Sequence, residues 1–351
     1  MPELIVIGAG LCGLALARAA TGRGAEVVVL EARARIGGRV LSHRTEAGAY
    51  DLGPAWVWPA IQPRIARTIQ AAGLVLTEQA EAGGFVYQDQ TGRIQRLPHG
   101  FAQEPPSMRI TGGIAALVEA VAADLAPGVV RLEHAVRRIA LTGSGVAVTA
   151  ETRSGPMTLH AARAALALPP RLISGIEILP ALPPSVQAAL AAVPGWMAGQ
   201  AKALALYDRP FWREAGLSGS AFSQAGPLGE LHDASLAGAA ETALFGFFSW
   251  PPALRAARRA ALPELVARQL GLLFGAEAAQ PREMIIQDWA TEHFTATEAD
   301  QANGNAHPDY RPIALPTPWG ERITLAGAEV APEFGGYLEG ALAAAEAAVI
   351  A

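Results

Sequence analysis

Residues 4–39 read LIVIGAGLCGLALARAATGRGAEVVVLEARARIGGR, and this stretch decides the fold. Its apolar, β-branched opening predicts a buried parallel strand, and the run rich in alanine and leucine after it predicts a helix. A second apolar run predicts a further strand. The expected elements are a strand over Leu4–Ile7, a helix over Leu14–Ala20 and a strand over Val27–Leu30.

Three glycines, Gly8, Gly10 and Gly13, connect the first strand to the helix. In a dinucleotide-binding turn the first glycine permits the tight turn, the second lets backbone approach a pyrophosphate, and the third lets the helix pack on the strand. Glu31 follows the second strand, where a carboxylate accepts hydrogen bonds from ribose hydroxyls and repels a 2′-phosphate. A purely structural turn is the alternative, but the complete unit favours a nicotinamide or flavin dinucleotide.

A second glycine turn decides between these two dinucleotides. The pattern Glu-Ala-x-x-x-x-Gly-Gly-Arg runs from Glu31 to Arg39, and Asp-Leu-Gly-Pro-Ala-Trp follows at 51–56. Together they resemble the flavin-containing amine oxidase family. Protoporphyrinogen oxidases and carotenoid desaturases carry close relatives of this pattern, so it identifies FAD better than it identifies the substrate.

The C-terminal segment carries a second resemblance to this family. Residues 322–329 read as a strand that ends in a small turn and Glu329, and FGGYLEG at 334–340 opens a last helix over 341–350. In the family this segment returns the chain to the sheet and aims the final helix at the flavin ring. A helix N-terminus beside the ring stabilises the negative charge of the reduced flavin.

The resemblance implies an α/β fold, with a Rossmann-like FAD-binding domain and an interleaved α+β substrate domain built on a mixed or antiparallel sheet. A chain of 351 residues suits two intertwined domains. The expected FAD-binding domain comprises 1–74, 107–172 and 282–351, and the expected substrate domain comprises 75–106 and 173–281. Strands expected at 129–133 with 136–141, at 145–150 and at 157–160 form a β-meander, and 84–97 form a hairpin.

The resemblance also implies which residues hold the cofactor. The expected FAD-binding residues are Gly8, Gly10, Gly13, Glu31, Ala32, Arg33, Gly38, Arg39, Gly53, Pro54, Ala55, Trp56, Val136, Trp289, Gly327, Glu329, Gly336, Tyr337 and Leu338. Some family members bind flavin covalently through a cysteine near the ring. The single cysteine here, Cys12, lies in the phosphate-binding turn, so the expected FAD is non-covalent, and a small buried side chain is the expected role of Cys12.

Lys202 is the single lysine of the chain, and it lies within the apolar strand expected at 201–207. Burial of a lysine is costly and lowers its pKa. Its spacing to Pro-Phe-Trp at 210–212 matches the family lysine that holds a water on the reactive ring nitrogen of the flavin. A side chain that snorkels from a strand edge is the structural alternative.

The resemblance places Tyr337 on the substrate-facing side of the ring, as one wall of an aromatic cage. Two facing rings steer a neutral amine to the flavin and exclude water. When Trp289 and the run Asn303-Gly304-Asn305-Ala306-His307 are aligned with the family, with one gap, His307 falls where a second aromatic residue often lies. The expected catalytic residues are therefore Lys202, Tyr337 and His307.

Charge and composition exclude several classes of partner. The net charge of −5 and the pI near 5.9 favour neither nucleic acid nor an anionic membrane as a partner. The densest basic cluster, Arg255, Arg258 and Arg259, is expected to be a solvated helix face. The single cysteine, the short segment before the first strand and the lack of a spanning apolar run favour a cytoplasmic protein. The histidines show no metal-ligand spacing, so no metal is expected.

The expected function is FAD-dependent oxidation of a small-molecule amine, with imine hydrolysis and reoxidation by oxygen or another acceptor. The alternatives are a desaturase or carbon-carbon oxidase, and a non-catalytic flavin-bound scaffold. Family members usually carry a large helical insertion before the helix that begins at Gly112-Gly113, and here only the short hairpin region stands in its place. The resemblance then implies either a more open site or a site roofed by a partner subunit, as in a homo-oligomer.

Overall fold

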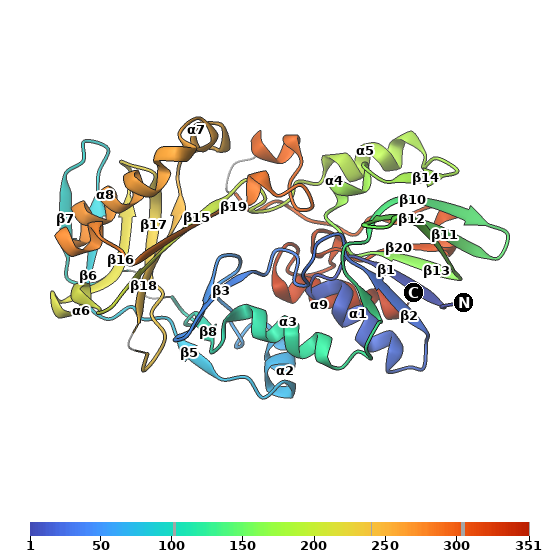
Figure 1. Cartoon of the computed structure of the whole chain (residues 1–351), viewed down its shortest axis with the longest axis horizontal. Coiled ribbons are helices and arrows are strands. Elements are labelled where there is room, and N and C mark those ends of the chain that lie inside the picture. Colours follow the sequence, from blue (N-terminus) through green and yellow to red (C-terminus); the bar gives the residue numbers. More distant parts are fainter. Residues whose placement is uncertain (101–102, 240, 303–305, 351) are drawn as a thin grey trace.

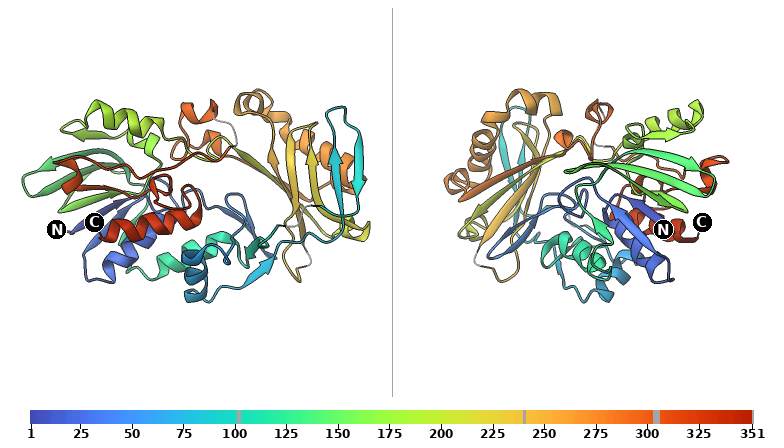
Figure 2. Two further views of the ribbon diagram at one scale, coloured as in Figure 1. Left: turned by 180° about the vertical axis from the view of Figure 1, so that it is seen from behind. Right: turned by 45° about the vertical axis from the view of Figure 1, so that its right-hand side comes forward.

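The computed structural model describes residues 1–100, 103–239, 241–302 and 306–350. The molecule is elongated and has two lobes, one built around a parallel sheet and the other around a larger sheet (Figure 1). Both termini lie in the first lobe (Figure 2). The chain passes between the lobes several times, so each lobe is assembled from segments that are distant in sequence.

The first lobe is centred on a five-stranded sheet in which every strand pair is parallel. Its strands, in spatial order, are β20 (Ile323–Leu325), β13 (Arg163–Leu166), β1 (Leu4–Ile7), β2 (Val27–Leu30) and β9 (Val130–Arg131). The two strands expected from the opening stretch are confirmed. The helix between them, α1 (Leu11–Thr21), begins before the expected Leu14, because Gly13 is part of its first turn.

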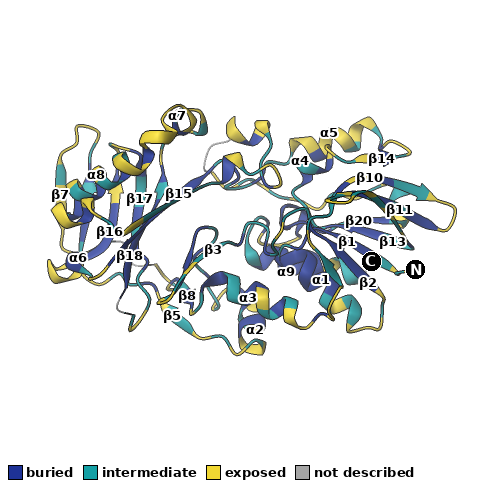
Figure 3. Cartoon of the chain, in the orientation of Figure 1, coloured by how far each residue is buried: buried dark blue, intermediate teal, exposed yellow. Residues whose placement is uncertain are grey.

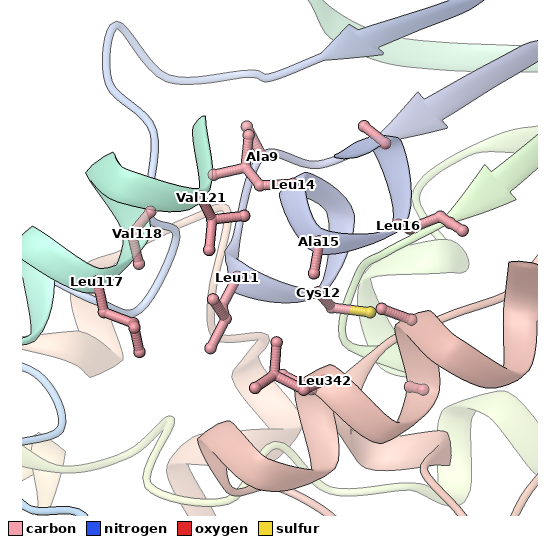
Figure 4. Packing of buried hydrophobic residues seen from close by; sticks show 14 of the residues in the cluster. Ala9, Leu11, Cys12, Leu14, Ala15, Leu16, Leu117, Val118, Val121 and Leu342 are labelled. Atoms are coloured by element: carbon pink, nitrogen blue, oxygen red, sulfur yellow. The ribbon is translucent and has the colours of Figure 1, made fainter. Parts of the chain in front are cut away.

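Three helices cover one face of this sheet: α1, α3 (Gly113–Ala123) and α9 (Leu338–Ile350). Figure 4 shows Leu11, Leu117 and Leu342 converging from these three helices. Figure 3 shows that α1 and α9 are among the most buried elements of the molecule. Because α1 and α9 follow the carboxyl ends of parallel strands, both begin at the same edge of the sheet.

A four-stranded sheet covers the opposite face. Its strands are β12 (Gly155–Ala161), β11 (Gly145–Thr152), β10 (Ala135–Thr142) and β14 (Glu177–Leu179). The expected meander is thereby confirmed for β10, β11 and β12, but the strand expected at 129–133 does not belong to it. Only Val130–Arg131 is a strand there, and it pairs with β2 instead. Glu133, which has a φ of 61°, separates it from the meander.

The second lobe is centred on a seven-stranded mixed sheet. Its strands, in spatial order, are β19 (Glu283–Asp288), β15 (Ala201–Tyr207), β18 (Thr242–Phe248), β17 (Leu228–Asp233), β16 (Leu217–Ser223), β6 (Gly84–Gln88) and β7 (Ile94–Leu97). The pair of β16 and β6 is parallel, and the other pairs are antiparallel. The expected hairpin at 84–97 is confirmed as β6 and β7.

The two faces of β15 have different roles. Ala201, Ala203 and Ala205 pack in the cluster that contains α8 (Leu262–Phe274). Since side chains alternate along a strand, Lys202 and Leu204 lie on the opposite face, toward the first lobe. The strand pattern thus directs the single lysine of the chain away from the core under α8.

Strand pairing departs from the expected domain boundaries in two places. Residues 283–288 form β19 and pair with β15, although the expected boundary at 282 assigns them to the FAD-binding domain. Residues 173–192 contribute Ile173, Ile178 and Leu190 to the core of the first lobe, although the expected boundary assigns them to the substrate domain. If the domains are divided by strand pairing, the chain passes from the first lobe to the second near residue 200 and returns near residue 289.

The remaining strands and α-helices complete the two lobes. They are the hairpin β3 (Ser42–Thr45) and β4 (Gly48–Asp51), the pair β5 (Leu76–Glu78) and β8 (Met108–Ile110), and the helices α2 (Pro63–Ala71), α4 (Pro170–Ile173), α5 (Pro184–Ala192), α6 (Phe211–Glu214) and α7 (Pro252–Ala257). Among the described residues, no helix is long and apolar enough to cross a membrane.

Helix α7 corrects one expectation about the basic cluster. Arg258 and Arg259 are exposed, but Arg255 is only 2% exposed. Its guanidinium donates to both carboxylate oxygens of Asp288 at 2.7 and 2.8 Å, and to the Gly199 carbonyl oxygen at 2.7 Å. The sequence pattern could not reveal this, because the partners come from β19 and from the loop before β15.

Arg255→Met is expected to lower the free energy of unfolding by about 3 kcal/mol, because it leaves the largely buried Asp288 carboxylate without its ion-pair partner. Urea titration followed by circular dichroism measures the change. Arg259→Met is the matched control from the exposed end of the same cluster, and we expect it to change stability by less than about 0.5 kcal/mol. Equal effects of the two substitutions would contradict a structural role for Arg255.

Candidate active site

A cavity of about 1040 Å³ lies between the two lobes. Its walls come from the carboxyl edge of the parallel sheet, from residues 52–56, from the start of α9 and from strands of the seven-stranded sheet. Every expected site residue lines it except Gly13 and His307. The structure therefore brings together segments from both ends and the middle of the chain.

The glycine turn after β1 contains two glycines that the chain itself requires. Gly8 has a φ of 102°, in the left-handed region that favours glycine, and a Cβ on Gly13 would lie 1.9 Å from the Gly8 carbonyl oxygen. Gly10 differs. It has a φ of −73°, and a Cβ there would meet only the Gly37 carbonyl oxygen, at 4.0 Å. Among the residues that the structure describes, none requires Gly10 to lack a side chain, so the open space beside it is available to a ligand.

Glu31 lies at the end of β2 and is 4% exposed. Its Oε2 accepts a hydrogen bond from Ala9 N at 2.8 Å, and its Oε1 accepts one from Arg33 N at 2.9 Å. Each carboxylate oxygen can accept a further hydrogen bond. The backbone contacts hold the carboxylate at the cavity wall, where Ala32 and Val136 also lie.

Arg33 binds a distant segment of the chain, residues 292–295, at the cavity wall. Its Nη2 donates to Thr295 Oγ1 at 2.8 Å and to Glu292 Oε2 at 3.1 Å. Phe294 lies against the same guanidinium, 5.5 Å from its centre. Sequence reasoning missed this segment, because no motif links 292–295 to the opening stretch.

Arg39 and Glu329 form an ion pair in the cavity wall. Glu329 is fully buried, and Arg39 Nη1 lies 2.6 Å from its Oε1. Neither carboxylate oxygen makes a well-directed hydrogen bond among the described residues. A buried carboxylate with unused acceptor positions is costly unless a ligand supplies donors.

Residues 53–56 form another wall of the cavity. A Cβ on Gly53 would lie 2.1 Å from the Arg39 carbonyl oxygen, so this wall packs directly on the second glycine turn. Trp289 holds it from the other side, because its Nε1 donates to the Leu52 carbonyl oxygen at 3.0 Å. Trp289 therefore supports the wall as well as lining the cavity.

The N-terminus of α9 opens onto the cavity at Gly336, Tyr337 and Leu338. Gly336 has a φ of 80°, and a Cβ there would lie 2.9 Å from the ring of Tyr310. The helix begins at Leu338, slightly before the expected residue 341. Its positive dipole end is thus directed toward whatever fills the cavity.

Three aromatic side chains cluster at this end. The rings of His307 and Tyr337 stack, with centroids 5.1 Å apart and planes 22° apart, and Trp196 lies 4.6 Å from Tyr337 and 4.7 Å from His307. Of the three, Trp196 and Tyr337 line the cavity and His307 does not. His307 instead lies against Tyr337, with its Nε2 2.8 Å from the Gly335 carbonyl oxygen. Residues 303–305, which the alignment used, lie outside the described residues.

Trp196 is a site residue that sequence reasoning missed. Its backbone N donates to Tyr310 Oη at 2.8 Å, and the preceding Gly195 N donates to Asp300 Oδ1 at 2.8 Å. Asp300 also accepts from Arg171 Nη1 at 2.6 Å. These contacts fix the loop that carries Trp196. The available signal was an aromatic residue after Pro194-Gly195, shortly before Lys202.

Lys202 is 2% exposed. Its Nζ donates to the Gly53 carbonyl oxygen at 2.6 Å and to the Asp51 carbonyl oxygen at 3.2 Å. The same nitrogen lies 4.6 Å from the ring centre of Phe245 and 5.0 Å from that of Phe247. The side chain is therefore held inside the cavity wall, and it does not snorkel to solvent.

Burial lowers the pKa of Lys202 from its ordinary 10.5 to about 7, because the charged form loses its hydration. The nearby Asp51 carboxylate opposes this change, and the Arg109 guanidinium adds to it. Near neutral pH both forms of the amine are then populated, which suits a group that holds or exchanges a proton at an active site.

Cys12 is buried within α1, and its Sγ contacts the Ala326 carbonyl oxygen. Burial raises the pKa of its thiol, with the nearby Glu329 carboxylate adding to the effect. A thiol of raised pKa is a poor nucleophile. This agrees with the expected role of Cys12 as a small packing residue.

The cavity has the features that an FAD molecule requires. Gly10 leaves space for a pyrophosphate at the start of α1, Glu31 offers free acceptor positions for ribose hydroxyls, and Glu329 is a buried carboxylate that is paired with Arg39 and keeps acceptor positions unused. The start of α9 offers a positive dipole end for the ring. The residues present fit this cofactor.

Comparison with known protein families agrees with this geometry. The family model described as flavin containing amine oxidoreductase matches residues 99–350, and the model described as NAD(P)-binding Rossmann-like domain matches residues 6–72. These two ranges together include the glycine turn, Lys202 and the start of α9.

Individual relatives align over nearly the whole chain. AofH of Mycobacterium tuberculosis, a protein assigned as a flavin-containing monoamine oxidase, is 27% identical over 461 aligned positions, which cover 99% of this chain and 97% of AofH. Putrescine oxidase of Kocuria rosea is 24% identical and covers 84% of this chain and 83% of its own. Because 461 positions exceed the 351 residues of this chain, AofH contains segments without a counterpart here.

Solved structures share the fold. A putrescine oxidase bound to putrescine superimposes with a TM-score of 0.81 at 21% identity, over 99% of this chain and 98% of the other. Cyclohexylamine oxidase of Brevibacterium oxydans gives a TM-score of 0.78 at 20% identity, over 99% and 98%. The α/β architecture, with a Rossmann-like domain and a second sheet domain, is therefore that of these oxidases.

Proposed function

Because this chain belongs to the flavin-containing amine oxidoreductase family, we propose that it oxidises small-molecule amines with non-covalently bound FAD. FAD, when bound, supplies the acceptor for a hydride equivalent from the carbon next to the amine nitrogen. The imine product reacts with water to give a carbonyl compound and an amine or ammonia. Oxygen would be the final acceptor of the two electrons and two protons, and would leave as hydrogen peroxide.

One observation carries this proposal: a single cavity runs from Glu31 to Lys202 and Tyr337. Its nucleotide end carries features for ribose and pyrophosphate, and its other end carries two aromatic rings and a buried amine. A cofactor that extends along this cavity would bring its reactive ring to the side chains that can orient an amine.

The residues of the chain have distinct roles in this proposal. Glu31 accepts hydrogen bonds from ribose, and the backbone at Gly10 approaches the pyrophosphate. Arg39 and Glu329 would hold the part of the cofactor that passes their ion pair. The start of α9 stabilises negative charge on the ring.

Tyr337 and Trp196 form the walls past which the substrate reaches the ring, and His307 supports Tyr337 from behind. Flat aromatic walls exclude water and leave room for a neutral amine. Lys202 holds a water molecule near the reacting atoms and can exchange a proton with it, because its pKa lies near 7.

Anaerobic titration of the FAD-loaded protein with a panel of amines tests the proposal. We expect at least one amine to bleach the flavin absorbance, and admission of oxygen to restore it with formation of hydrogen peroxide. Bleaching by a porphyrinogen or a carotenoid alone would favour carbon-carbon oxidation instead. If FAD-loaded protein is reduced by none of these compounds, the chain is a flavin-bound scaffold and the proposal fails.

A further inference from the structure

Two further charged side chains are buried beside Lys202, and both lie outside the cavity lining. Asp51 ends β4 and is 3% exposed, and Arg109 lies in the middle of β8 and is 6% exposed. Charges interact more strongly in the interior of a protein than in water. The three residues therefore form one electrostatic cluster behind the cavity wall.

The Asp51 carboxylate is held in place at the start of α3. Its Oδ1 accepts hydrogen bonds from Ser42 Oγ at 2.6 Å and from Ile114 N, in the first turn of α3, at 2.9 Å. Its backbone oxygen accepts from Lys202 Nζ at 3.2 Å. The side chain of Asp51 is thus fixed on the residue to which the lysine itself is bound.

Several neighbours favour the charged form of Asp51. Burial raises the pKa of its carboxyl group, and four groups oppose this: the Arg109 guanidinium, the Ser42 hydroxyl, the Lys202 amine and the Ile114 N–H. The positive dipole end of α3 acts in the same direction as these four. Because both hydrogen-bond donors are neutral, the negative charge of Asp51 acts mainly on the two cations.

Arg109 approaches the lysine from β8. Its guanidinium centre lies 5.9 Å from the ring centre of Phe245, and Lys202 Nζ lies 4.6 Å from the same ring. Arg109 Nη1 donates to the Asp233 carbonyl oxygen at a long 3.4 Å. The Asp233 carboxylate accepts from Arg213 Nε at 2.7 Å. Two cations therefore share one aromatic ring, and the nearest acid on this side is paired with a third cation.

Asp51 and Arg109 act on Lys202 in opposite directions. Burial lowers the pKa of Lys202, the Asp51 carboxylate raises it, and the Arg109 guanidinium lowers it further. These directions follow from charge, since an acid favours the ammonium form of an amine and a cation disfavours it. Glu230 and His232, two other titratable side chains of β17, pair with each other at 2.8 Å.

We propose that Asp51 and Arg109 are positioning residues that together set the charge of Lys202, with Asp51 favouring the ammonium and Arg109 favouring the neutral amine. This balance lets the lysine take up and release a proton near neutral pH. Its consequence for turnover rests on the proposed amine oxidation, in which Lys202 acts through its charge. The charge itself is a property of the folded protein.

Because the chain contains a single lysine, the charge of Lys202 can be observed directly. Protein grown with lysine that carries ¹³C at Cε gives one lysine signal, provided that any purification tag lacks lysine. The chemical shift of this carbon follows the protonation of the adjacent nitrogen. The FAD-loaded protein is titrated over the pH range in which it stays folded, and we expect a wild-type midpoint near 7.

Two substitutions that each remove one charge should move this midpoint in opposite directions. Asp51→Asn keeps an oxygen for the Ser42 and Ile114 donors, and we expect it to lower the midpoint by roughly one pH unit. Arg109→Gln should raise the midpoint by a similar amount. Glu119→Gln is the matched control, because it removes a negative charge from a side chain of α3 that is 53% exposed. We expect it to leave the midpoint unchanged.

Opposite shifts distinguish electrostatic control from a structural role, because the loss of a packing contact has no reason to follow the sign of the charge removed. Midpoints that stay at the wild-type value in both variants, or that move in the same direction, overturn the inference. Thermal unfolding checks that each variant is folded. If Asp51→Asn does not fold, Arg109→Gln decides alone, since an unchanged or lowered midpoint in it overturns the inference.

The titration uses no substrate, so its result is separate from the test of the proposed function. If no amine reduces the flavin, the proposed function fails, and the midpoints still decide the inference. If amines do reduce it, the pH profile of flavin reoxidation provides a second readout. Its step should move to lower pH in Asp51→Asn and to higher pH in Arg109→Gln, in parallel with the lysine signal.

Discussion

Lys202→Met is expected to slow reoxidation of the reduced flavin by oxygen on the order of tenfold to a hundredfold, with FAD still bound. Oxygen acquires negative charge as it is reduced, and an ammonium group at the cavity wall stabilises that charge. Methionine fills similar volume without the charge or the hydrogen bonds to Gly53 and Asp51. Stopped-flow mixing of the reduced enzyme with oxygen measures the rate, and the flavin absorbance of gel-filtered protein measures the FAD content.

The pH profile of this half-reaction gives an independent check. Since the pKa of Lys202 is about 7, the side chain is an ammonium below that pH and neutral above it. The wild-type rate should therefore fall as pH rises through about 7, and the Lys202→Met rate should not show this step. The substrate has already reacted in this half of the cycle, so titration of the amine substrate does not contribute to the step.

Leu204→Met is the matched control. Leu204 is fully buried on the same face of β15 and carries no charge, and this exchange conserves volume. Its reoxidation rate and pH profile should equal those of the wild type. If Lys202→Met reoxidises at the wild-type rate, or if the step near pH 7 persists in it, Lys202 has no electrostatic role in the oxygen reaction.

The sequence predicts those parts of the site in which local backbone geometry and residue type are sufficient to place a residue at the cavity. Gly8, Gly10 and Glu31 belong to one continuous unit, and their positions follow from the ends of β1 and β2. The same holds for the start of α9, where a glycine pair precedes the helix. In each case a strand or helix boundary directs a few adjacent residues to one edge of the sheet.

Other parts depend on contacts between distant segments, and no local pattern contains them. Trp196 is fixed by Tyr310 and by Asp300, which lie more than 100 positions away along the chain. His307 was expected on the wall opposite Tyr337, but its ring stacks on Tyr337 outside the cavity lining, and the loop at 195–196 supplies a ring to the cavity. The alignment could not decide between Trp196 and His307, because which of the two rings lines the cavity depends on how the chain packs.

The position of Glu230 could not be predicted for a different reason: it depends on the register of strand β17. Whether a residue of β17 faces the cavity depends on the pairing of β17 with β18, and this pairing contains an irregularity between Leu228 and Glu230. A shift by one residue moves every side chain of a strand to the other face. The place of Glu230 in the cavity lining is therefore visible only in the assembled sheet.

Two substitutions in the opening turn should separate the requirements of the fold from those of the cofactor. Gly13→Ala is expected to destabilise the protein by about 3 kcal/mol, because its Cβ would lie 1.9 Å from the Gly8 carbonyl oxygen and α1 would have to move away from β1. Gly10→Ala should leave the stability of the FAD-free protein within about 0.5 kcal/mol of wild type, since the new methyl group meets only an oxygen at 4.0 Å.

The same Gly10→Ala methyl group would project into the space proposed for the pyrophosphate, so the dissociation constant of FAD should rise at least tenfold, or about 1.4 kcal/mol. Thermal unfolding of the FAD-free variants and fluorescence titration with FAD measure the two effects separately. Normal FAD affinity in Gly10→Ala would mean that the pyrophosphate does not pass beside Gly10. A Gly10→Ala protein that unfolds as readily as Gly13→Ala would mean that Gly10 serves the fold and not the cofactor.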